Sequence, residues 1–320
     1  MKKYLLGLGD QIAGGYKIGR DFKLPAAYKN VRQIVFFGVG GSAIAGDVIA
    51  ELMHGQSPVP FSVHRSSDIP KFLDKNTLAI FSTYSGNTWE TAQAFGQAVK
   101  ARAKIVLMTS GGALLETAKK KKIPYLVIPR GLPPRCAIGY LTFSVLGVLE
   151  QGGWVRTSPK EVEAVRKSLK QFTPAMARKL AKKLQHKVVF LYGESAPVLK
   201  RWRAQLAENA KTLASQHKLP EMFHNEVEGW QFPKSFARRA AAVFFTKKGP
   251  CPLKNKVRMA QALIRKQGAT VVEIPVNGHS SLETIFDLIY LGDWVSYELA
   301  LLNKVDPVAI PVIESIKKQP

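Results

Sequence analysis

A chain of 320 residues, 46% of them hydrophobic, is long enough for two α/β domains with separate cores. The net charge of +24 favours anionic ligands, but the basic residues are spread along several segments without a helix-turn-helix, zinc or RNP-like motif, so we expect no nucleic-acid partner. No apolar run is long enough to span a membrane, and the N-terminal apolar stretch is too short for a signal peptide, which predicts a cytoplasmic protein without a membrane partner.

The two cysteines, Cys136 and Cys251, do not have the spacing of metal ligands. We expect a pair of structural thiols and no metal site. A single disulfide between them is the alternative.

A glycine-rich loop follows the first predicted strand, which is the apolar run at residues 33–37. The loop contains Gly38, Gly40, Gly41 and Ser42 and leads into a predicted helix. This order of elements is suited to anions, because the free backbone N–H groups and the dipole of the helix start point towards the ligand.

The same loop also matches the dinucleotide-binding pattern G-x-G-x-x-A, with Gly38, Gly40 and Ala43 at the fixed positions. The next predicted strand, near residues 60–63, is followed by no carboxylate that would bind the ribose of NAD, although Arg65 is suited to the 2′-phosphate of NADP. An NADP-dependent oxidoreductase is therefore an alternative. The doubled glycine followed by a serine favours a smaller phosphosugar.

A second loop of this kind follows the strand predicted at residues 78–81. Its hydroxyl groups belong to Thr83, Ser85 and Thr88, and Thr88 is suited to cap the helix predicted at residues 89–101. Hydroxyls and backbone N–H groups surround a phosphate without needing a positive charge. One such loop would be an ordinary capped turn, but two predict a phosphate site composed of Gly41, Ser42, Thr83, Ser85 and Thr88.

Further strands at residues 104–108 and 125–128 alternate with helices, which predicts a doubly wound parallel sheet. The last of these strands leads into a loop with three prolines, Arg130 and Arg135. Ligands bind at the carboxyl edge of such sheets, so we expect this stiff loop to present guanidinium groups there.

The second half repeats this alternation after a break at Gly152-Gly153. A basic helical stretch at residues 159–184 is the expected connector. Strands are predicted at residues 188–193, 241–245 and 270–274.

These patterns predict two α-β-α sandwich domains. The first is expected at residues 1–152 and begins with a helical segment that is interrupted at Gly14-Gly15. The second is expected at residues 153–320 and contains a long helix at residues 281–302. Aromatic residues recur on this helix at three- and four-residue spacing, which indicates either core or a dimer face: Phe286, Tyr290, Trp294 and Tyr297.

Three features together resemble one enzyme family. The first is the loop Gly40-Gly41-Ser42 with Gly46-Asp47, and the second is the hydroxyl loop from Thr83 to Thr91. The third is the pair of segments Glu208-Asn209-Ala210-Lys211 and His224-Asn225-Glu226. The chain resembles the bifunctional phosphoglucose/phosphomannose isomerases, which are built from two sugar isomerase (SIS) domains, and the resemblance extends over nearly the whole chain. Thr83 stands where the family more often has serine, but it keeps the hydroxyl group.

The resemblance implies an aldose–ketose isomerase that interconverts glucose 6-phosphate and mannose 6-phosphate with fructose 6-phosphate through a cis-enediol, without metal or cofactor. It implies that His224 opens the sugar ring, that Glu208 moves the proton between C1 and C2, and that Arg135 stabilises the enediolate. Lys317 resembles the family's active-site lysine, with Lys318 as the alternative. The resemblance also implies a homodimer with a composite active site, in which the ring-opening histidine comes from the neighbouring subunit.

Other interpretations remain for these residues. Glu208 taken alone would be an exposed helix residue in an i,i+3 pair with Lys211, and Glu226 is the alternative base. A non-catalytic phosphosugar-binding protein would keep the phosphate loops and lose the acid and base, so Glu208 and His224 argue against it. His279 lies at a strand-to-helix turn and is expected to belong to a helix cap.

Overall fold

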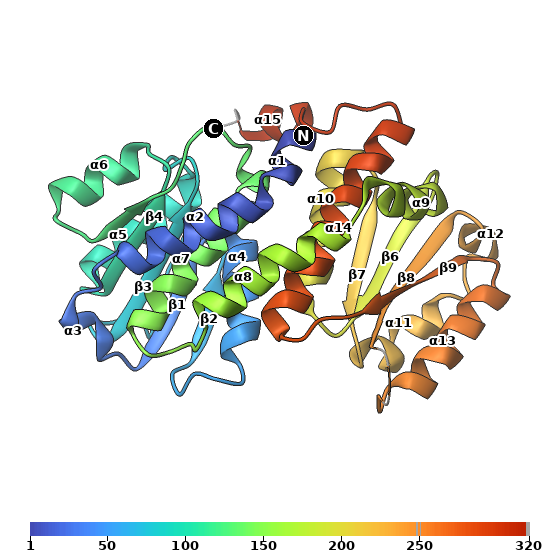
Figure 1. Cartoon of the computed structure of the whole chain (residues 1–320), viewed down its shortest axis with the longest axis horizontal. Coiled ribbons are helices and arrows are strands. Elements are labelled where there is room, and N and C mark those ends of the chain that lie inside the picture. Colours follow the sequence, from blue (N-terminus) through green and yellow to red (C-terminus); the bar gives the residue numbers. More distant parts are fainter. Residues whose placement is uncertain (248, 250, 318–320) are drawn as a thin grey trace. The chain divides into compact units, whose positions relative to one another are not determined.

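The computed structural model describes residues 1–247, 249 and 251–317 (Figure 1). The chain forms two compact units, which we call the first unit (residues 6–166) and the second unit (residues 167–320 together with residues 1–5). Each unit contains a parallel sheet with helices packed on it, which confirms the predicted α/β class. None of the helices in the described part of the chain combines the length and hydrophobicity needed to span a bilayer.

The sheet of the first unit has five parallel strands in the order β2-β1-β3-β4-β5. Nearly every residue of β1 and β3 is buried, as expected for the continuous apolar runs that predicted them. Because β1 and β3 are neighbours, the loops that follow them lie at the same edge of the sheet. The strands are β1 (Gln33–Phe37), β2 (Phe61–His64), β3 (Thr77–Thr83), β4 (Lys104–Thr109) and β5 (Tyr125–Val127).

Helices pack on both faces of this sheet. One face forms a core with α5 and α6 in which the rings of Phe37 and Phe81 stack with centroids 4.4 Å apart. On the other face, α4 comes so close that a Cβ on Gly46 would lie 2.4 Å from the ring of Phe36. The helices are α2 (Leu8–Asp21), α3 (Ala26–Lys29), α4 (Gly41–Met53), α5 (Trp89–Lys100), α6 (Ala113–Lys120), the 3-10 helix η1 (Pro134–Cys136) and α7 (Ile138–Gln151).

Helix α2 runs without interruption through Gly14-Gly15, so the predicted break is wrong. The glycines of α2 serve close packing on α7 instead. A Cβ on Gly15 would lie 3.0 Å from the carbonyl oxygen of Gly139, and one on Gly19 would lie 2.2 Å from the carbonyl oxygen of Ser144. Only residues without a side chain allow the two backbones to approach this closely.

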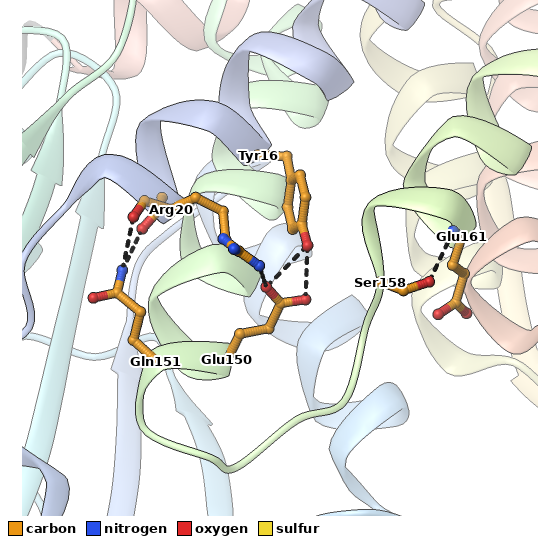
Figure 2. Close-up of polar contacts among 7 residues, drawn as sticks. Tyr16, Arg20, Glu150, Gln151, Ser158 and Glu161 are labelled. Atoms are coloured by element: carbon orange, nitrogen blue, oxygen red, sulfur yellow. Dashed lines mark hydrogen bonds and ion pairs between the residues drawn. The ribbon is translucent and has the colours of Figure 1, made fainter.

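Polar contacts fasten the end of α2 to the end of α7 (Figure 2). The hydroxyl of Tyr16 lies 3.0 Å from each carboxylate oxygen of Glu150, and the guanidinium of Arg20 lies 3.5 Å from one of them. The side-chain amide of Gln151 donates to the carbonyl of Gly19 at 2.7 Å. Burial, reinforced by the hydrogen bond to Glu150, raises the pKa of Tyr16 to about 12, and burial also raises the pKa of Glu150.

The sheet of the second unit has four parallel strands in the order β7-β6-β8-β9. Three of them lie where apolar runs predict strands. The edge strand β7 was not predicted, because its sequence Ala-Ser-Gln-His-Lys is polar and half-exposed. The strands are β6 (Val188–Gly193), β7 (Ala214–Lys218), β8 (Ala240–Lys247) and β9 (Thr270–Val276).

Helices also pack on both faces of the second sheet. Tyr192 and Phe244 join a core with α13 and the segments around α11, whereas the ring of Trp202 on α10 packs edge-on against Phe245, with centroids 5.0 Å apart. The helices of this unit are α9 (Pro174–Leu184), α10 (Ala196–Ala210), the 3-10 helix η3 (Glu221–His224), α11 (Glu226–Gly229), α12 (Lys234–Ala237), α13 (Lys254–Lys266), α14 (Ser281–Leu302) and α15 (Pro311–Lys317). Helix α1 (Lys2–Leu6) begins the chain.

The expected connector at residues 159–184 is not one helix. It consists of α8 (Pro159–Ser168), the 3-10 turn η2 (Leu169–Gln171) and α9. The break lies at Thr173-Pro174, because a proline lacks the N–H group of a helix interior and disfavours helical geometry at the residue before it. Thr173 then starts α9 as its N-cap, and its hydroxyl accepts from the N–H of Met176 at 3.4 Å.

The aromatic stripe of α14 is part of the core of the second unit. Phe286, Tyr290 and Trp294 are 0%, 7% and 2% exposed, and α14 packs along α9 and α10. The stripe therefore does not support a dimer face.

The two cysteines are thiols, as expected. Cys136 is buried in the first unit and Cys251 is half-buried in the second. Among the described residues, no group of three His, Cys, Asp or Glu side chains is placed to hold a metal ion.

Candidate active site

The glycine-rich loop and Arg135 meet at the carboxyl edge of the first unit's sheet. Gly40 has a φ of 55°, in the left-handed region that favours glycine, and α4 begins at the next residue. A Cβ on Gly41 would lie 3.1 Å from the Cα of Arg135, so the two backbones are in contact. The side chains of Ser42 and Arg135 are both buried. The structure thus brings Arg135 into contact with a loop that lies far from it in the sequence.

The hydroxyl loop lies at the same edge. The hydroxyls of Thr83 and Thr88 are 3.0 Å apart, Thr83 is buried, and the Ser85 side chain is exposed. The N–H of Gly86 donates to the Thr83 hydroxyl at 3.3 Å, and the N–H of Asn87 donates to the Ser85 hydroxyl at 3.2 Å. Thr88 is the N-cap residue of α5, as predicted, but its side chain faces Thr83 and makes no capping hydrogen bond.

Close backbone contacts fix the conformation of this loop. Gly86 has a φ of 71°, and a Cβ there would lie 1.7 Å from the carbonyl oxygen of Gly111 in the loop after β4. The side-chain carbonyl of Asn87 accepts from the N–H of Ala113 at 2.9 Å. A Cβ on Gly38 would lie 3.0 Å from the carbonyl oxygen at the end of β3, so the loops after β1 and β3 start side by side. The edge therefore presents two rigid loops with hydroxyl and backbone groups.

Arg65, the residue suited to the 2′-phosphate of NADP, forms an ion pair with Asp47 on α4. The carboxylate of Asp47 is buried, so the guanidinium already neutralises a charge that burial would otherwise penalise. A bound 2′-phosphate would have to compete with this carboxylate. The ion pair therefore argues against the dinucleotide interpretation of the glycine-rich loop.

Glu208 lies half-buried in the last turn of α10, in the second unit. Helix α10 is held on α14 by buried polar contacts. The guanidinium of Arg201 donates to both carboxylate oxygens of Asp293, at 3.0 and 2.8 Å, and the amide of Asn209 donates to the Ser296 hydroxyl at 2.9 Å. Because a buried, bidentate ion pair is costly to separate, these contacts fix the helix that carries Glu208.

His224 is exposed at the end of η3, and side chains of the sheet bind the turn that follows it. The carboxylate of Glu226 accepts from the Tyr192 hydroxyl at 2.6 Å and lies 2.8 Å from Nδ1 of His217. Burial, with the hydrogen bond to Glu226, raises the pKa of Tyr192 far above its usual range. Both oxygens of Glu226 are thus engaged in holding the turn to β6 and β7, an arrangement that favours Glu208 over Glu226 as the base.

Lys317 is exposed at the end of α15, and its alternative Lys318 lies outside the described residues. Glu208, His224 and Lys317 lie in α10, at the end of η3 and at the end of α15. The structure thus places the three on separate elements of the second unit.

The turn around His279 is a helix cap, as predicted. The Ser280 hydroxyl accepts from the N–H of Glu283 at 3.2 Å, and the Glu283 carboxylate accepts from the N–H of His279 at 3.3 Å. The two bonds cap the start of α14 in a variant of the capping box, in which the Glu283 carboxylate binds the residue before the N-cap.

The sequence is similar to curated isomerases along its full length. Residues 174–319 match the model of the bacterial phospho-glucose isomerase C-terminal SIS domain. The bifunctional phosphoglucose/phosphomannose isomerase of Caldicellulosiruptor bescii is 33% identical over 334 aligned positions, which cover 100% of this chain and 98% of that protein. This chain belongs to the bifunctional phosphoglucose/phosphomannose isomerase family. The family member of Aquifex aeolicus is 32% identical over 292 positions and 89% of each chain.

The fold agrees with a solved structure of distant sequence. The C-terminal domain of glucosamine-fructose-6-phosphate aminotransferase from Francisella tularensis superposes with a TM-score of 0.75 at 11% identity, over 97% of both chains. At this identity the likeness supports the fold alone.

Tyr84 lies in the hydroxyl loop, and the family motifs do not indicate a role for its side chain. The structure links this side chain to the proline-rich loop. Its hydroxyl donates to the carbonyl of Pro129 and accepts from the N–H of Leu132, both at 2.9 Å. These contacts tie the loop that carries Arg135 to the hydroxyl loop. Local patterns do not indicate this role, because the partners of Tyr84 lie 45 and 48 residues further along the chain.

Proposed function

We propose that this protein is an aldose–ketose isomerase that interconverts glucose 6-phosphate and mannose 6-phosphate with fructose 6-phosphate. The observation that carries the proposal is its full-length similarity to bifunctional phosphoglucose/phosphomannose isomerases, including 33% identity to the protein of Caldicellulosiruptor bescii. Two rigid loops of hydroxyl and backbone groups at one sheet edge support a phosphosugar as the ligand.

We assign phosphate binding to Gly41, Ser42, Thr83, Ser85 and Thr88. Backbone N–H groups at the starts of α4 and α5, together with the hydroxyls, provide donors for the phosphate oxygens. These donors carry no formal charge, so they hold a dianion by hydrogen bonds and by the helix dipoles. The backbone of Arg135 contacts Gly41 in the glycine-rich loop, and we assign its guanidinium to stabilisation of the anionic intermediate.

Isomerisation then requires a ring-opening acid and one base. We assign ring opening to His224, whose exposed imidazole is open to substrate, with Lys317 assisting. We assign the proton transfer between C1 and C2 to Glu208. A carboxylate is ionised at neutral pH and therefore acts as a base. Helix α10 fixes the position of the Glu208 backbone, which keeps the carboxylate oriented for proton transfer. None of these assigned steps calls for a metal ion or a cofactor.

The direct test is to incubate the purified protein with fructose 6-phosphate alone and to follow both aldose phosphates by NMR. We expect glucose 6-phosphate and mannose 6-phosphate to appear without added nucleotide, and their initial rates give the substrate preference. A phosphosugar-binding protein without catalysis would leave fructose 6-phosphate unchanged. An NADP-dependent oxidoreductase would instead change the absorbance of added NADPH.

The proposal includes a homodimer with a composite active site, in which His224 of one subunit serves the other. A soluble site of action in the cytoplasm fits an enzyme of phosphorylated sugars, since their charge keeps them from crossing membranes. Light scattering during turnover tests the assembly: we expect the mass of two chains. An active species with the mass of one chain would contradict the composite site.

A further inference from the structure

Lys211 occupies an unusual position at the end of α10. It is the C-cap residue, and its φ of 52° and ψ of 37° lie in the left-handed region. Glycine is the residue that this conformation favours, because a Cβ crowds the backbone there. This backbone therefore does not require a lysine, and the contacts of the Lys211 side chain indicate another role for it.

The ammonium group of Lys211 is surrounded by main-chain carbonyl groups. Nζ donates to the carbonyl of Glu208 at 2.9 Å, to that of Asp306 at 2.6 Å and to that of Ala309 at 2.7 Å. The carbonyl of Asn209 lies at 3.4 Å. The three short contacts match the three N–H donors of a lysine. Two of the accepting carbonyls lie 95 and 98 residues further along the chain. These bonds are therefore long-range contacts and not the local capping of a helix end.

The distant carbonyls belong to a turn that is folded around the ammonium group. The carboxylate of Asp306 accepts from the N–H of Val308 at 2.7 Å. Hydrogen bonds from the backbone N–H groups of Val308 and Ala309 lower the pKa of Asp306, and the charge of Lys211 lowers it further to a smaller extent. Two residues after Ala309 the chain enters α15, the helix that ends at Lys317.

Helix α15 has little core of its own. None of its described residues is buried, and Val312 and Ile316 are 72% and 67% exposed. A helix without a buried face takes its position largely from the segment that precedes it. The bonds from Lys211 to residues 306–309 are therefore well placed to fix where α15 begins.

We infer that Lys211 is a positioning residue for isomerisation, an inference that rests on the proposed function. Its ammonium group joins the backbone of Glu208, the assigned base, to the segment that leads to Lys317. Loss of the ammonium group would free both the last turn of α10 and the start of α15. Small displacements of a catalytic group lower turnover strongly, whereas the phosphate loops of the first unit are not touched.

The test uses the full-length Lys211→Gly variant, because glycine suits the left-handed backbone and removes only the ammonium group and its stem. We expect kcat with fructose 6-phosphate to fall by about 10- to 100-fold while KM changes by less than about threefold. Hydrogen–deuterium exchange of residues 305–310 should become about 10-fold faster or more. Lys211→Arg, which keeps the charge and several donors, should recover part of the lost turnover.

The matched control is Lys304→Gly. Lys304 has the same residue type and nearly the same φ, 56°, in the same unit, and its exposed side chain makes none of the hydrogen bonds that the structure describes. This variant should keep kcat within about twofold of the wild type.

Wild-type turnover in Lys211→Gly, or an equal loss in Lys304→Gly, would overturn the inference about Lys211 alone. A wild-type protein without isomerase activity would overturn the proposed function and this inference with it. Unchanged exchange at residues 305–310 in Lys211→Gly would also contradict it, whatever the activity.

Discussion

The two units place the same order of strands behind very different loops. In the first unit β1 lies between β2 and β3, and in the second unit β6 lies between β7 and β8. The loop after β1 is rich in glycine and leads to the buried Ser42, whereas the loop after β6 carries Glu194. The carboxylate of Glu194 is bound by Lys247, at the end of β8, with an N–O distance of 2.6 Å.

This difference shows that the fold supplies an edge in both units, but the loop chemistry determines which edge suits a phosphate. Uncharged donors and two helix starts favour a dianion at the first edge. At the second edge the carboxylate of Glu194 repels a dianion, and it forms an ion pair with the ammonium group of Lys247. We therefore expect binding energy to come from the first unit and proton transfer from the second, so that variants in the two units separate KM from kcat.

The largest effect is expected for Glu208→Gln in the second unit. Glutamine keeps the size and hydrogen bonding of the side chain but does not accept the proton from carbon, so kcat should fall by about 10²–10⁴-fold with little change in KM. Steady-state kinetics with fructose 6-phosphate measure both constants.

The matched variant for Glu208→Gln is Glu226→Gln. Glu226 is bound by Tyr192 and His217, so its change should affect folding more than turnover. If Glu226→Gln abolishes turnover while Glu208→Gln stays active, the base belongs to the His-Asn-Glu turn.

A smaller effect, and one on KM, is expected for Ser85→Ala combined with Thr88→Val in the first unit. Hydrogen bonds to charged groups contribute about 1.5–3 kcal/mol each, so the loss of two should raise KM by about 10²-fold or more. The control pair in the second unit is Ser195→Ala, after β6, with Thr246→Val, near the end of β8, and it should leave KM unchanged. Equal KM values for the two double variants would contradict the assignment of phosphate to the first unit.

The smallest effect concerns the pH dependence of stability in the second unit. Asp287 on α14 is buried, and this burial raises the pKa of its carboxyl group to about 6. The charge of Glu283 also raises this pKa, whereas the hydrogen bond from Ser168 at 2.5 Å lowers it. Between about pH 4 and pH 6 the folded state binds more protons than the unfolded state, whose aspartates have a pKa of about 3.9. The free energy of unfolding should therefore fall by about 1–2 kcal/mol as the pH rises through this window.

Asp287→Asn removes this ionisation and should remove most of that pH dependence. Urea unfolding at pH 4 and pH 7, followed by tryptophan fluorescence, measures the change in both proteins. If the free energy of unfolding changed by the same amount between pH 4 and pH 7 in the wild type and in the variant, Asp287 would not titrate as described.

The strands of both sheets followed from the sequence where burial on two faces made them continuously apolar, as in β1, β3 and β8. Polar β7 gave no such signal, because an edge strand is only partly buried. The glycines of α2 suggested a break, although they allow contact with a helix more than a hundred residues away. Local pattern predicts elements well and long-range packing poorly.

The same distinction holds for the candidate site. The two loops at the first edge were predictable, because strand, turn residues and helix start follow one another within about ten residues. The roles of Tyr84 and Lys211 were not, since their partners lie 45 to 98 residues away. Glu208 and His224 were identified through the family resemblance, because neither a half-buried glutamate nor an exposed histidine is distinctive alone.

The central claim is that this protein moves a proton between C1 and C2 of a sugar 6-phosphate, and turnover in D₂O tests it most directly. A proton that passes through the Glu208 carboxylate exchanges with solvent over repeated turnovers. After many turnovers of fructose 6-phosphate, NMR should therefore find deuterium at C2 of the aldose phosphates and at C1 of the remaining ketose. Aldose phosphates formed without any deuterium at C2, or no aldose phosphate at all, would contradict the account.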